Sequence, residues 1–361
     1  MKKILVRAPN WIGDQILAFP FFYHLRRAYP DAQITSICVE WVRDLQFRSQ
    51  VDDVFVLPVP AENTLHEKFK ILEIAARALR EQGPWDLAIS LPNSFSAAWL
   101  LWRSRAVRRR GYRVDGRGIF LNQGLRWNSS PDRHRAQAYV DLLPETLRPA
   151  RPIREFWGVP PENDLDPEIS GELESFDLEK EWLGVAPIEP PSHPYWILAP
   201  GSKAESRRWP LSSYSRLVKL VFEQTGWIGR VIGSQEDRPL AEHLCEENPG
   251  KVENHTGNSA VTALWKLFRN TQFTVTNESG LAHVASICGS FVQVVCGAAD
   301  PRRTRPLGPG RVQVTVNPVE CWPCERNRCF QPSPQTLQCL KGIDPDSVWA
   351  EIQRGKRLGT Q

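Results

Sequence analysis

The sequence predicts an α/β protein made of two Rossmann-like halves, each with a parallel sheet covered by helices. Three observations lead to this prediction. The chain has 361 residues, enough for two domains of ordinary size. Short β-branched runs alternate with longer amphipathic stretches over most of its length. The alternation is interrupted once, by a segment rich in proline and acidic residues over 152–194.

The first half, residues 1–151, begins the alternation. Apolar runs predict strands over 3–8, 33–39, 54–57 and 87–91. Helical periodicity predicts helices over 14–29 and 65–81, and Gly83-Pro84 ends the second of them. Parallel strands joined by helices are typical of βαβ units, so this half is expected to form one domain.

The second half, residues 195–361, repeats the pattern after the proline-rich segment. We expect residues 152–194 to connect the two domains, because such composition is typical of domain boundaries. Further strands are predicted over 195–199, 229–232, 273–276, 291–295 and 312–316. Helices are predicted over 211–224, 238–247, 261–268 and 280–288.

The composition is that of an ordinary folded protein, with 41% apolar and 24% charged residues and a formal net charge of +4. It excludes disorder, collagen and coiled coil. No apolar run reaches the roughly 18 residues of a membrane span, and Arg7 interrupts the short apolar run at the start before a signal-peptide core can form, so a cytosolic protein is expected. The charge is uneven, because seven arginines fall between positions 103 and 117.

Asp14 follows the first predicted strand, at the end of the segment 9–14 (Pro-Asn-Trp-Ile-Gly-Asp) that leads into an apolar helix. In open parallel sheets, ligands bind at the carboxyl ends of the strands. The position therefore makes Asp14 a candidate for a catalytic cleft. A carboxylate in a first helical turn is also a common helix cap, and this turn alone leaves both roles open.

A turn suited to bind an anion follows the predicted strand over 195–199. Its small residues, Gly201 and Ser202, would let backbone N–H groups approach a phosphate. The guanidinium groups of Arg207 and Arg208 match phosphate oxygens in two-point geometry. A solvated basic turn is the alternative.

A second turn of this kind lies in the segment 276–283, where a strand ends and a helix begins at Ser279-Gly280. The exposed N–H groups of that helix start would hold a pyrophosphate, and His283 lies one turn further on the same face. A packed core histidine is the alternative reading. A complete G-x-G-x-x-G after the first strand and a P-loop motif are both missing, which disfavours a simple dehydrogenase and a P-loop NTPase.

Four cysteines near the end of the chain follow the spacing C-x2-C-x4-C-x9-C, namely Cys321, Cys324, Cys329 and Cys339. Four soft thiolates at such short spacing suit a tetrahedral zinc or iron site. Such a site has no open position, so its metal would be structural rather than catalytic. Reduced structural thiols or a facultative disulfide are the alternatives.

Together these segments resemble the ADP-heptose:lipopolysaccharide heptosyltransferases of glycosyltransferase family 9, which have the GT-B fold, and among them the heptosyltransferase II branch. The likeness runs through nearly the whole chain except the proline-rich segment. It rests on residues 7–14, on 91–95 (Leu-Pro-Asn-Ser-Phe), on 110–112 (Arg-Gly-Tyr), on 277–283 and on the cysteines with Cys339-Leu340. The resemblance implies two Rossmann-like domains whose parallel sheets face a central cleft.

The resemblance also implies a reaction, the inverting transfer of L-glycero-D-manno-heptose from ADP-heptose to the inner core of lipopolysaccharide. The enzyme would work peripherally at the cytoplasmic face of the inner membrane. Asp14 matches the family's general base, which takes the proton of the attacking acceptor hydroxyl. No cofactor or divalent metal is required, because the helix start at Ser279-Gly280 and cationic side chains would stabilise the departing ADP.

The resemblance assigns the remaining site residues to the two domains. The donor would be bound in the second half by Ser202, Arg207, Arg208, Glu236, Asp237, Glu278, Ser279, Gly280, Leu281 and His283. The acceptor would be bound in the first half by Asn10, Trp11, Asn93, Arg110, Arg113 and Arg117. An acceptor with phosphates and acidic sugars in an anionic membrane would favour the arginine cluster, and a solvated basic loop is the alternative.

The sequence departs from the family pattern at two donor positions, with Glu278 in place of the usual Asp and Arg207 in place of the usual Lys. Either Glu236 or Asp237 could bind the nucleotide ribose. Two other functions remain open. The first is a related GT-B transferase with another nucleotide sugar or a protein acceptor, which Glu278 favours. The second is a zinc-containing nucleic-acid-binding protein, which would leave Asp14 and residues 277–283 without a role, so no nucleic-acid partner is expected.

Overall fold

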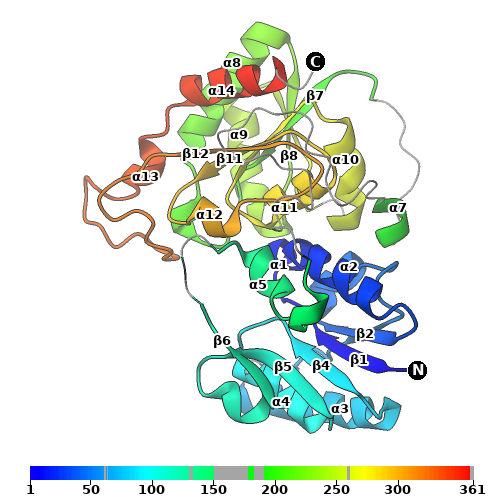
Figure 1. Ribbon diagram of the computed structural model, residues 1–361. Helices are drawn as coiled ribbons and strands as arrows, with labels where there is room; N and C mark the ends of the chain where they lie inside the picture. The colour runs from blue at the N-terminus through cyan, green and yellow to red at the C-terminus, as the bar shows by residue number, and fades with distance from the viewer. Residues whose placement is uncertain are drawn as a thin grey trace. The chain divides into compact units, whose positions relative to one another are not determined.

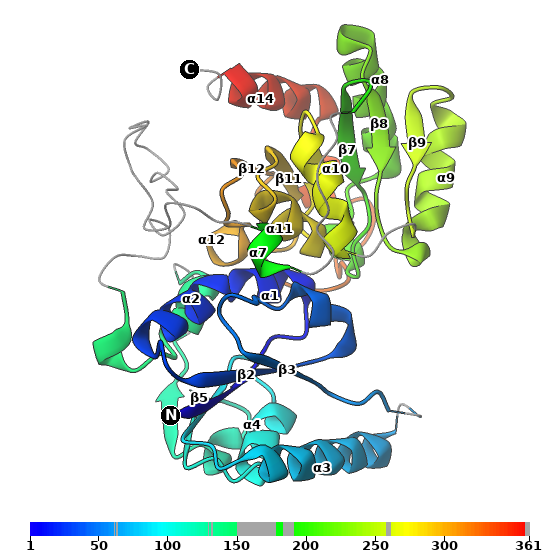
Figure 2. The same cartoon turned by 90° about the vertical axis from the view of Figure 1, so that its right-hand side faces the viewer.

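The computed structural model describes residues 1–60, 62, 64–128, 130, 133–149, 178–182, 191–257 and 261–357. The chain divides into two compact units, Met1–Leu183 and Gly184–Gln361. Each unit contains a six-stranded sheet, and all the strand pairings are parallel (Figures 1 and 2). The predicted α/β class with two parallel sheets is therefore confirmed. Most of the expected connection over 152–194 lies outside the described residues.

The sheet of the first unit has the strand order β3-β2-β1-β4-β5-β6. Its strands are β1 (Lys3–Arg7), β2 (Gln33–Cys38), β3 (Asp53–Val56), β4 (Leu87–Ser90), β5 (Arg108–Arg113) and β6 (Gln123–Arg126). The first four were predicted from their apolar runs: β1, β2 and β4 are buried along most of their length, whereas the edge strand β3 is partly exposed. The order of the strands reverses between β1 and β4, the position at which such sheets bind ligands.

Helices cover both faces of this sheet (Figure 1). One layer contains α1 (Ile12–Leu17), α2 (Phe19–Ala28) and α5 (Arg135–Val140), and the other contains α3 (Leu65–Gln82) and α4 (Phe95–Arg103). The single helix expected over 14–29 is divided at Ala18. Pro20 lies at the start of α2 and has no N–H to continue the hydrogen-bond ladder, which accounts for the division.

Short elements complete the first unit. They are the 3-10 helices η1 (Glu40–Leu45), η2 (Arg117–Phe120) and η3 (Glu145–Leu147), and the helical turn α7 (Leu178–Glu181). The Glu181 carboxylate accepts a hydrogen bond from the Ser49 N–H at 3.3 Å, so α7 packs on the first unit.

The sheet of the second unit has the strand order β12-β11-β10-β7-β8-β9. Its strands are β7 (Tyr195–Ala199), β8 (Ile228–Val231), β9 (Val252–Asn254), β10 (Thr274–Asn277), β11 (Val292–Cys296) and β12 (Val312–Val316). Its order reverses between β7 and β10, as the first sheet's does between β1 and β4. Five of these six strands were predicted from their apolar runs, and the three-residue β9 was too short to produce a pattern.

The helices of the second unit are α8 (Leu211–Thr225), α9 (Arg238–Glu247), α10 (Trp265–Asn270), α11 (Gly280–Ile287), α12 (Pro301–Thr304), α13 (Gln338–Lys341) and α14 (Pro345–Arg357). Residues of α8, α9 and α14 pack on one face of the sheet in a single apolar core. Within it, the Phe273 ring lies 5.1 Å from the Trp196 ring and 5.8 Å from the Trp349 ring. Aromatic burial of this kind fixes the sheet on which the loops of this unit depend.

Within the part of the chain that the structure describes, none of the helices has the length and apolar character needed to cross a membrane.

Candidate active site

The carboxyl ends of β1, β4 and β5 lie side by side in the first sheet and bring several predicted residues to one edge. The loop after β1 carries Asn10 and Trp11 and leads to Asp14 in the first turn of α1. The loop after β4 carries Asn93, and Arg113 ends β5. Positions up to about 100 residues apart in the sequence are thus gathered at the topological switch point, as expected for an open parallel sheet.

Asp14 is held by side chains of α5 rather than by its own helix. The Tyr139 hydroxyl donates a hydrogen bond to Asp14 Oδ1 at 3.0 Å, and Arg135 Nε lies 3.9 Å from the same oxygen. The Asp14 side chain is 30% exposed. Among the described residues, Asp14 Oδ2 makes no hydrogen bond, so one carboxylate oxygen is held and the other is available.

Burial raises the pKa of Tyr139 well above its ordinary value, and the nearby negative charge of Asp14 raises it further. Tyr139 therefore stays protonated at physiological pH and remains a hydrogen-bond donor to Asp14. The sequence contained no signal for Tyr139 or Arg135, because both lie more than 120 residues from Asp14 and neither belongs to a recognisable motif.

Asn10 is fixed by two neighbours. Its side-chain oxygen accepts a hydrogen bond from the buried guanidinium of Arg7, and its backbone oxygen accepts one from Trp41 Nε1 at 2.6 Å. Burial lowers the pKa of Arg7 to about 10, which still leaves the group charged at physiological pH. The Trp11 ring next to Asn10 is largely exposed. The loop thus presents a fixed amide and an exposed indole.

Arg117 has a different role from the one predicted. Its guanidinium is fully buried and donates to the backbone oxygens of Tyr112 at 2.7 Å and Pro92 at 2.5 Å, and to Asn93 Oδ1 at 2.5 Å. Burial lowers the pKa of Arg117 to about 10. Because no face of this group reaches solvent, we remove Arg117 from the acceptor contacts. It positions Asn93 instead.

Most of the arginine cluster is also used inside the fold. The half-buried Arg110 donates to the backbone oxygens of Leu142 at 2.6 Å and Leu143 at 3.1 Å, and burial lowers its pKa. Arg109 donates in the same way to Phe120 and Ala106. Arg113 is exposed, so of the three arginines predicted to bind the acceptor it is the one open to an anion.

In the second unit, Asn277 joins the two loops that were expected to bind the donor. It ends β10 and is fully buried. Its Oδ1 accepts hydrogen bonds from Trp209 N at 3.0 Å and from the Tyr214 hydroxyl at 3.1 Å, and its Nδ2 donates to Pro200 O at 2.5 Å. Asn277 therefore spans the switch point between β10 and β7. A polar residue at the end of a buried strand is the signal that could have identified it.

The two departures from the family pattern meet in the structure. Arg207 Nη1 lies 2.7 Å from Glu278 Oε2, and the Glu278 side chain is almost fully buried. Arg208 is exposed, and its Nε donates to Ser202 O at 2.7 Å. Arg207, Arg208, Ser202 and Glu278 therefore lie in one group at the carboxyl ends of β7 and β10.

The start of α11 has the geometry of an anion site. Ser279 is the N-cap, and its side chain forms no capping hydrogen bond with the helix. The first N–H groups, of Gly280 and Leu281, are the ones that have no acceptor within an α-helix. His283 follows one turn later and is buried. Serine, glycine and a helix start at the end of a strand suit a phosphate group.

Asp237 shapes the loop after β8. Its Oδ2 accepts hydrogen bonds from the N–H and the hydroxyl of Ser234, both at 2.8 Å, in a capping box. A Cβ at Gly201 would lie 2.3 Å from Asp237 Oδ1, so the glycine lets the two loops approach. Glu236 is exposed and pairs with Lys203, whose hydrogen bond lowers the pKa of the carboxyl.

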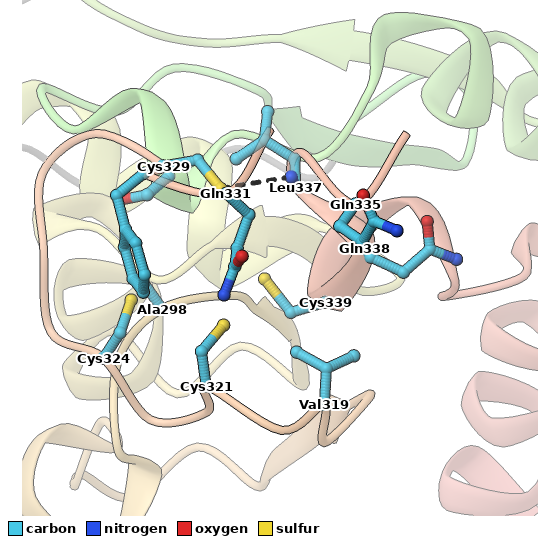
Figure 3. A pocket seen from close by; sticks show the side chains of 12 residues that line it. Ala298, Val319, Cys321, Cys324, Cys329, Gln331, Gln335, Leu337, Gln338 and Cys339 are labelled. Carbon is cyan, nitrogen blue, oxygen red and sulfur yellow. Dashed lines mark hydrogen bonds between the residues drawn. The ribbon is translucent and has the colours of Figure 1, made fainter. Parts of the chain in front are cut away.

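The four cysteines predicted to bind metal line one pocket, together with Ser206, Ala298 and other residues of the C-terminal region (Figure 3). All four are free thiols. Burial raises the pKa of Cys339, and the three neighbouring cysteines raise it further. Within the described ranges, however, no group of three or more Cys, His, Asp or Glu side chains is placed to hold a metal ion. The donor set suits a soft metal, and the metal itself is not confirmed.

The cysteine-rich loop is bound to the turn that carries Arg207. Ser206 N donates to Asn327 O at 3.2 Å, and the Ser206 hydroxyl donates to Arg326 O. Ala298 N donates to Ser206 O at 3.3 Å, and Glu325 N donates to Ala298 O at 2.8 Å. The loop that contains the cysteines thus supports the Arg207 turn through its backbone.

Comparison with known proteins identifies the family. Residues 74–333 match glycosyltransferase family 9 (heptosyltransferase). The lipooligosaccharide heptosyltransferase 2 of Haemophilus ducreyi is 28% identical over 318 residues, which cover 84% of this chain and 86% of the relative.

Two solved structures are similar in fold. The ADP-heptose lps heptosyltransferase II of E. coli has a TM-score of 0.71 at 20% identity and full coverage of both chains. TibC, an iron-containing dodecameric glycosyltransferase of enterotoxigenic E. coli, has a TM-score of 0.57 at 13% identity and covers 98% of this chain and 80% of its own. The GT-B fold implied by the resemblance is thereby confirmed. Because the family match spans more than two thirds of the chain, the protein belongs to glycosyltransferase family 9, the heptosyltransferases, and is a glycosyltransferase.

Proposed function

We propose that this enzyme transfers L-glycero-D-manno-heptose from ADP-heptose to the inner core of lipopolysaccharide with inversion at the anomeric carbon. The observation that carries the proposal is Asp14, a carboxylate with one oxygen held and the other available, at the ligand-binding edge of a parallel sheet. The names of two similar proteins support the substrates: the Haemophilus ducreyi relative is a lipooligosaccharide heptosyltransferase, and the E. coli structure is an ADP-heptose lps heptosyltransferase.

In the proposed reaction, Asp14 is the general base. The oxygen of an acceptor hydroxyl attacks the anomeric carbon of the heptose, and the bond from that carbon to the β-phosphate oxygen of ADP breaks, with its electron pair leaving on the phosphate. Asp14 takes the hydroxyl proton as the new bond forms. Tyr139 cannot accept that proton, because its hydroxyl stays protonated, and it holds Oδ1 so that Oδ2 is the oxygen that receives the proton.

The donor is proposed to bind at the carboxyl ends of β7, β8 and β10. The N–H groups of Gly280 and Leu281 at the start of α11 would bind the pyrophosphate, with Arg207 and Arg208 beside them. Positive charge placed there in advance stabilises the departing ADP without a metal ion. Ser202, Ser279 and His283 complete the proposed donor site.

Glu278 is proposed to bind a sugar hydroxyl while it remains paired with Arg207. The pair is consistent with the two departures from the family pattern having arisen together, because the longer carboxylate side chain meets a guanidinium at 2.7 Å. Of the two ribose candidates, Asp237 already holds its own loop, which favours Glu236 as the ribose contact.

The acceptor is proposed to bind to Asn10, Trp11, Asn93 and Arg113 in the first half, with Arg110 supporting the loop at Leu142 and Leu143. In this proposal residues 1–151 form the acceptor domain, 152–194 the connection, and 195–361 the nucleotide-sugar domain. The enzyme would act in the cytoplasm, at the inner face of the inner membrane, where a lipid-anchored acceptor is presented.

The four-cysteine cluster is proposed to hold a structural zinc or iron ion. Support comes from four thiols around one pocket and from the iron in the similar TibC. Such a metal would fix the loop that supports Arg207, and no step of the reaction passes through it. Elemental analysis of protein purified without chelator should find near-stoichiometric zinc or iron, and a metal-free protein of full activity would contradict this part of the proposal.

Calorimetric titration with ADP-heptose, ADP and UDP in parallel tests the proposed donor. Selective binding of the two adenine compounds is expected. Binding of UDP alone would indicate a glycosyltransferase of the same fold with a different donor. This is the alternative function, a transferase for another nucleotide sugar, that the Glu278 substitution favours. Binding of none of the three would reject the proposed donor site.

A further inference from the structure

An apolar surface lies on α3, α4 and η2 of the first unit. It consists of Phe69, Phe95, Trp99, Trp102, Ile119 and Phe120, which we call the aromatic surface. The Phe69 and Trp99 rings are 5.7 Å apart, and the Phe120 ring lies 5.1 Å from Phe95 and 5.4 Å from Trp102. The Trp102 side chain is 43% exposed and Ile119 is 80% exposed.

Helix α4 shows why this surface is unusual. Ala97, Ala98, Leu100 and Leu101 are buried against the sheet, as expected of the inner face of a helix. The opposite face carries Phe95, Trp99 and Trp102, spaced four and three residues apart, so they form one stripe. A surface helix ordinarily has charged and polar residues on its outer face. Large apolar patches at the surface of a protein generally mark an interaction site.

The charge around the aromatic surface indicates what it binds. The exposed charged residues of 64–126 are seven Lys or Arg against three Asp or Glu, although the whole chain has a net charge of only +4. The Arg103 guanidinium lies 5.8 Å from the Trp99 ring and 5.7 Å from the Trp102 ring, but it is paired with the Glu73 carboxylate, with its Nε 2.8 Å from Glu73 Oε2. Arg105 and Arg108, just after α4 and at the start of β5, are exposed. Two copies of such a basic surface would repel each other, which disfavours self-association.

Indole and phenyl rings next to arginines suit the interface of an anionic bilayer. Tryptophan is enriched at the level of lipid headgroups, and arginines near an anionic membrane surface are attracted to it. We propose that the aromatic surface docks this chain onto an anionic phospholipid membrane, with Trp102 and Ile119 entering the interface and the exposed Arg105 and Arg108 contacting headgroup phosphates.

The proposed docking indicates from which side of the first unit the acceptor would approach its site. Helix α4 begins after the carboxyl end of β4, and η2 follows the carboxyl end of β5. The same two strand ends carry Asn93 and Arg113. The biological purpose of docking rests on the proposed function, because a lipid-anchored acceptor would then arrive from the side on which the aromatic surface lies.

Vesicle flotation tests the docking surface with the full chain and no substrate. The protein should float with vesicles of phosphatidylcholine and phosphatidylglycerol, and much less with phosphatidylcholine alone. Salt at about 1 M, which shortens the screening length to about 3 Å, should remove the preference for anionic lipid. The double variant Trp102→Gln, Ile119→Ser should lower the partition coefficient at least about tenfold, because it removes the two side chains proposed to enter the interface.

A matched control is Val59→Ser, since Val59 is 70% exposed but lies outside the aromatic surface. It should float like the unchanged chain. Hydrogen exchange of peptides from β1 and β4, which belong to the same unit as the substitutions, serves as the check that each variant is folded. Failure of the unchanged chain to bind anionic vesicles would overturn the proposal, as would equal binding by the double variant. Concentration-dependent dimers that the double variant abolishes would instead assign the surface to a second copy. None of these vesicle experiments measures donor binding. A failure of the proposed donor site would be seen separately, as the absence of ADP binding in calorimetry.

Discussion

Replacing Asn277 by alanine should loosen two loops of the second unit at once. Asn277 is fully buried, and its amide joins the end of β10 to Pro200, to Trp209 and to Tyr214. Alanine removes the amide, so the Pro200 carbonyl, the Trp209 N–H and the Tyr214 hydroxyl each lose the hydrogen bond that they make with Asn277. A change of side-chain volume alone would be a smaller perturbation than the loss of these three hydrogen bonds.

The magnitude follows from the number of buried groups left without a partner. Each costs about 1–3 kcal/mol, so three cost at least about 3 kcal/mol. Since about 1.4 kcal/mol corresponds to a tenfold change in an equilibrium constant, the equilibrium constant for local opening should rise roughly 150-fold. The variant Tyr214→Phe removes a single one of these hydrogen bonds and should cost about 1 kcal/mol, or roughly fivefold, which makes it a graded control.

Hydrogen exchange is the appropriate assay, because it measures opening locally in a chain of two units. Peptides over 195–210 and 273–283 should lose protection by about the calculated factor in Asn277→Ala, and peptides from β1 and β4 should not change. ADP affinity should fall in the same variant. Unchanged protection of both loops would refute the reasoning about Asn277, and unchanged ADP affinity with lost protection would show that these loops do not hold the donor.

Three further predictions concern other parts of the fold. Arg117→Met should destabilise the first unit by about 3 kcal/mol, because it removes the three hydrogen bonds that the buried guanidinium donates to Tyr112 O, Pro92 O and Asn93 Oδ1, and a urea midpoint equal to that of the unchanged chain would argue against this. Gly201→Ala should weaken ADP binding at least about tenfold in calorimetry, since its Cβ would lie 2.3 Å from Asp237 Oδ1. Burial alone would raise the pKa of Asp300, but hydrogen bonds from the Arg302 side chain and N–H lower it below its ordinary value. The stability that Asp300 contributes is therefore present above about pH 4 and is lost as the pH falls through the lower folded-state pKa. The urea midpoint of Asp300→Asn should consequently fall less steeply with decreasing pH, in the acid range, than the urea midpoint of the unchanged chain.

The strands that could be predicted are those with a short apolar run, whether fully buried, as in β4 and β7, or partly exposed at a sheet edge, as in β3 and β12. Strand β5, with the sequence Arg-Arg-Arg-Gly-Tyr-Arg, was not predicted, because its arginines resemble a solvated basic run. In the structure, Arg109 and Arg110 donate hydrogen bonds to the backbone oxygens of Phe120 and Leu142. These charged side chains therefore bind to the protein backbone rather than to water. A sequence pattern does not distinguish these two uses of arginine.

The candidate site shows the same limit. Asp14 and the 277–283 segment were identified because each follows a strand directly, where local order in the sequence reflects position in the sheet. Tyr139 reaches Asp14 only through the packing of α5 on α1, and that contact depends on the whole unit. The spacing of the four cysteines predicted that they would be neighbours, and they do line one pocket. Spacing alone does not determine whether the sulfurs are placed to bind a metal.

The most direct test of the proposed mechanism is the turnover of Asp14→Asn with ADP-heptose and a lipopolysaccharide inner-core acceptor. Asparagine has nearly the same shape and still accepts the hydrogen bond from Tyr139, but it cannot take the acceptor proton. We predict that kcat falls at least about a hundredfold while calorimetric ADP affinity stays within about twofold. A variant that turns over at the rate of the unchanged enzyme would contradict the assignment of Asp14 as the base.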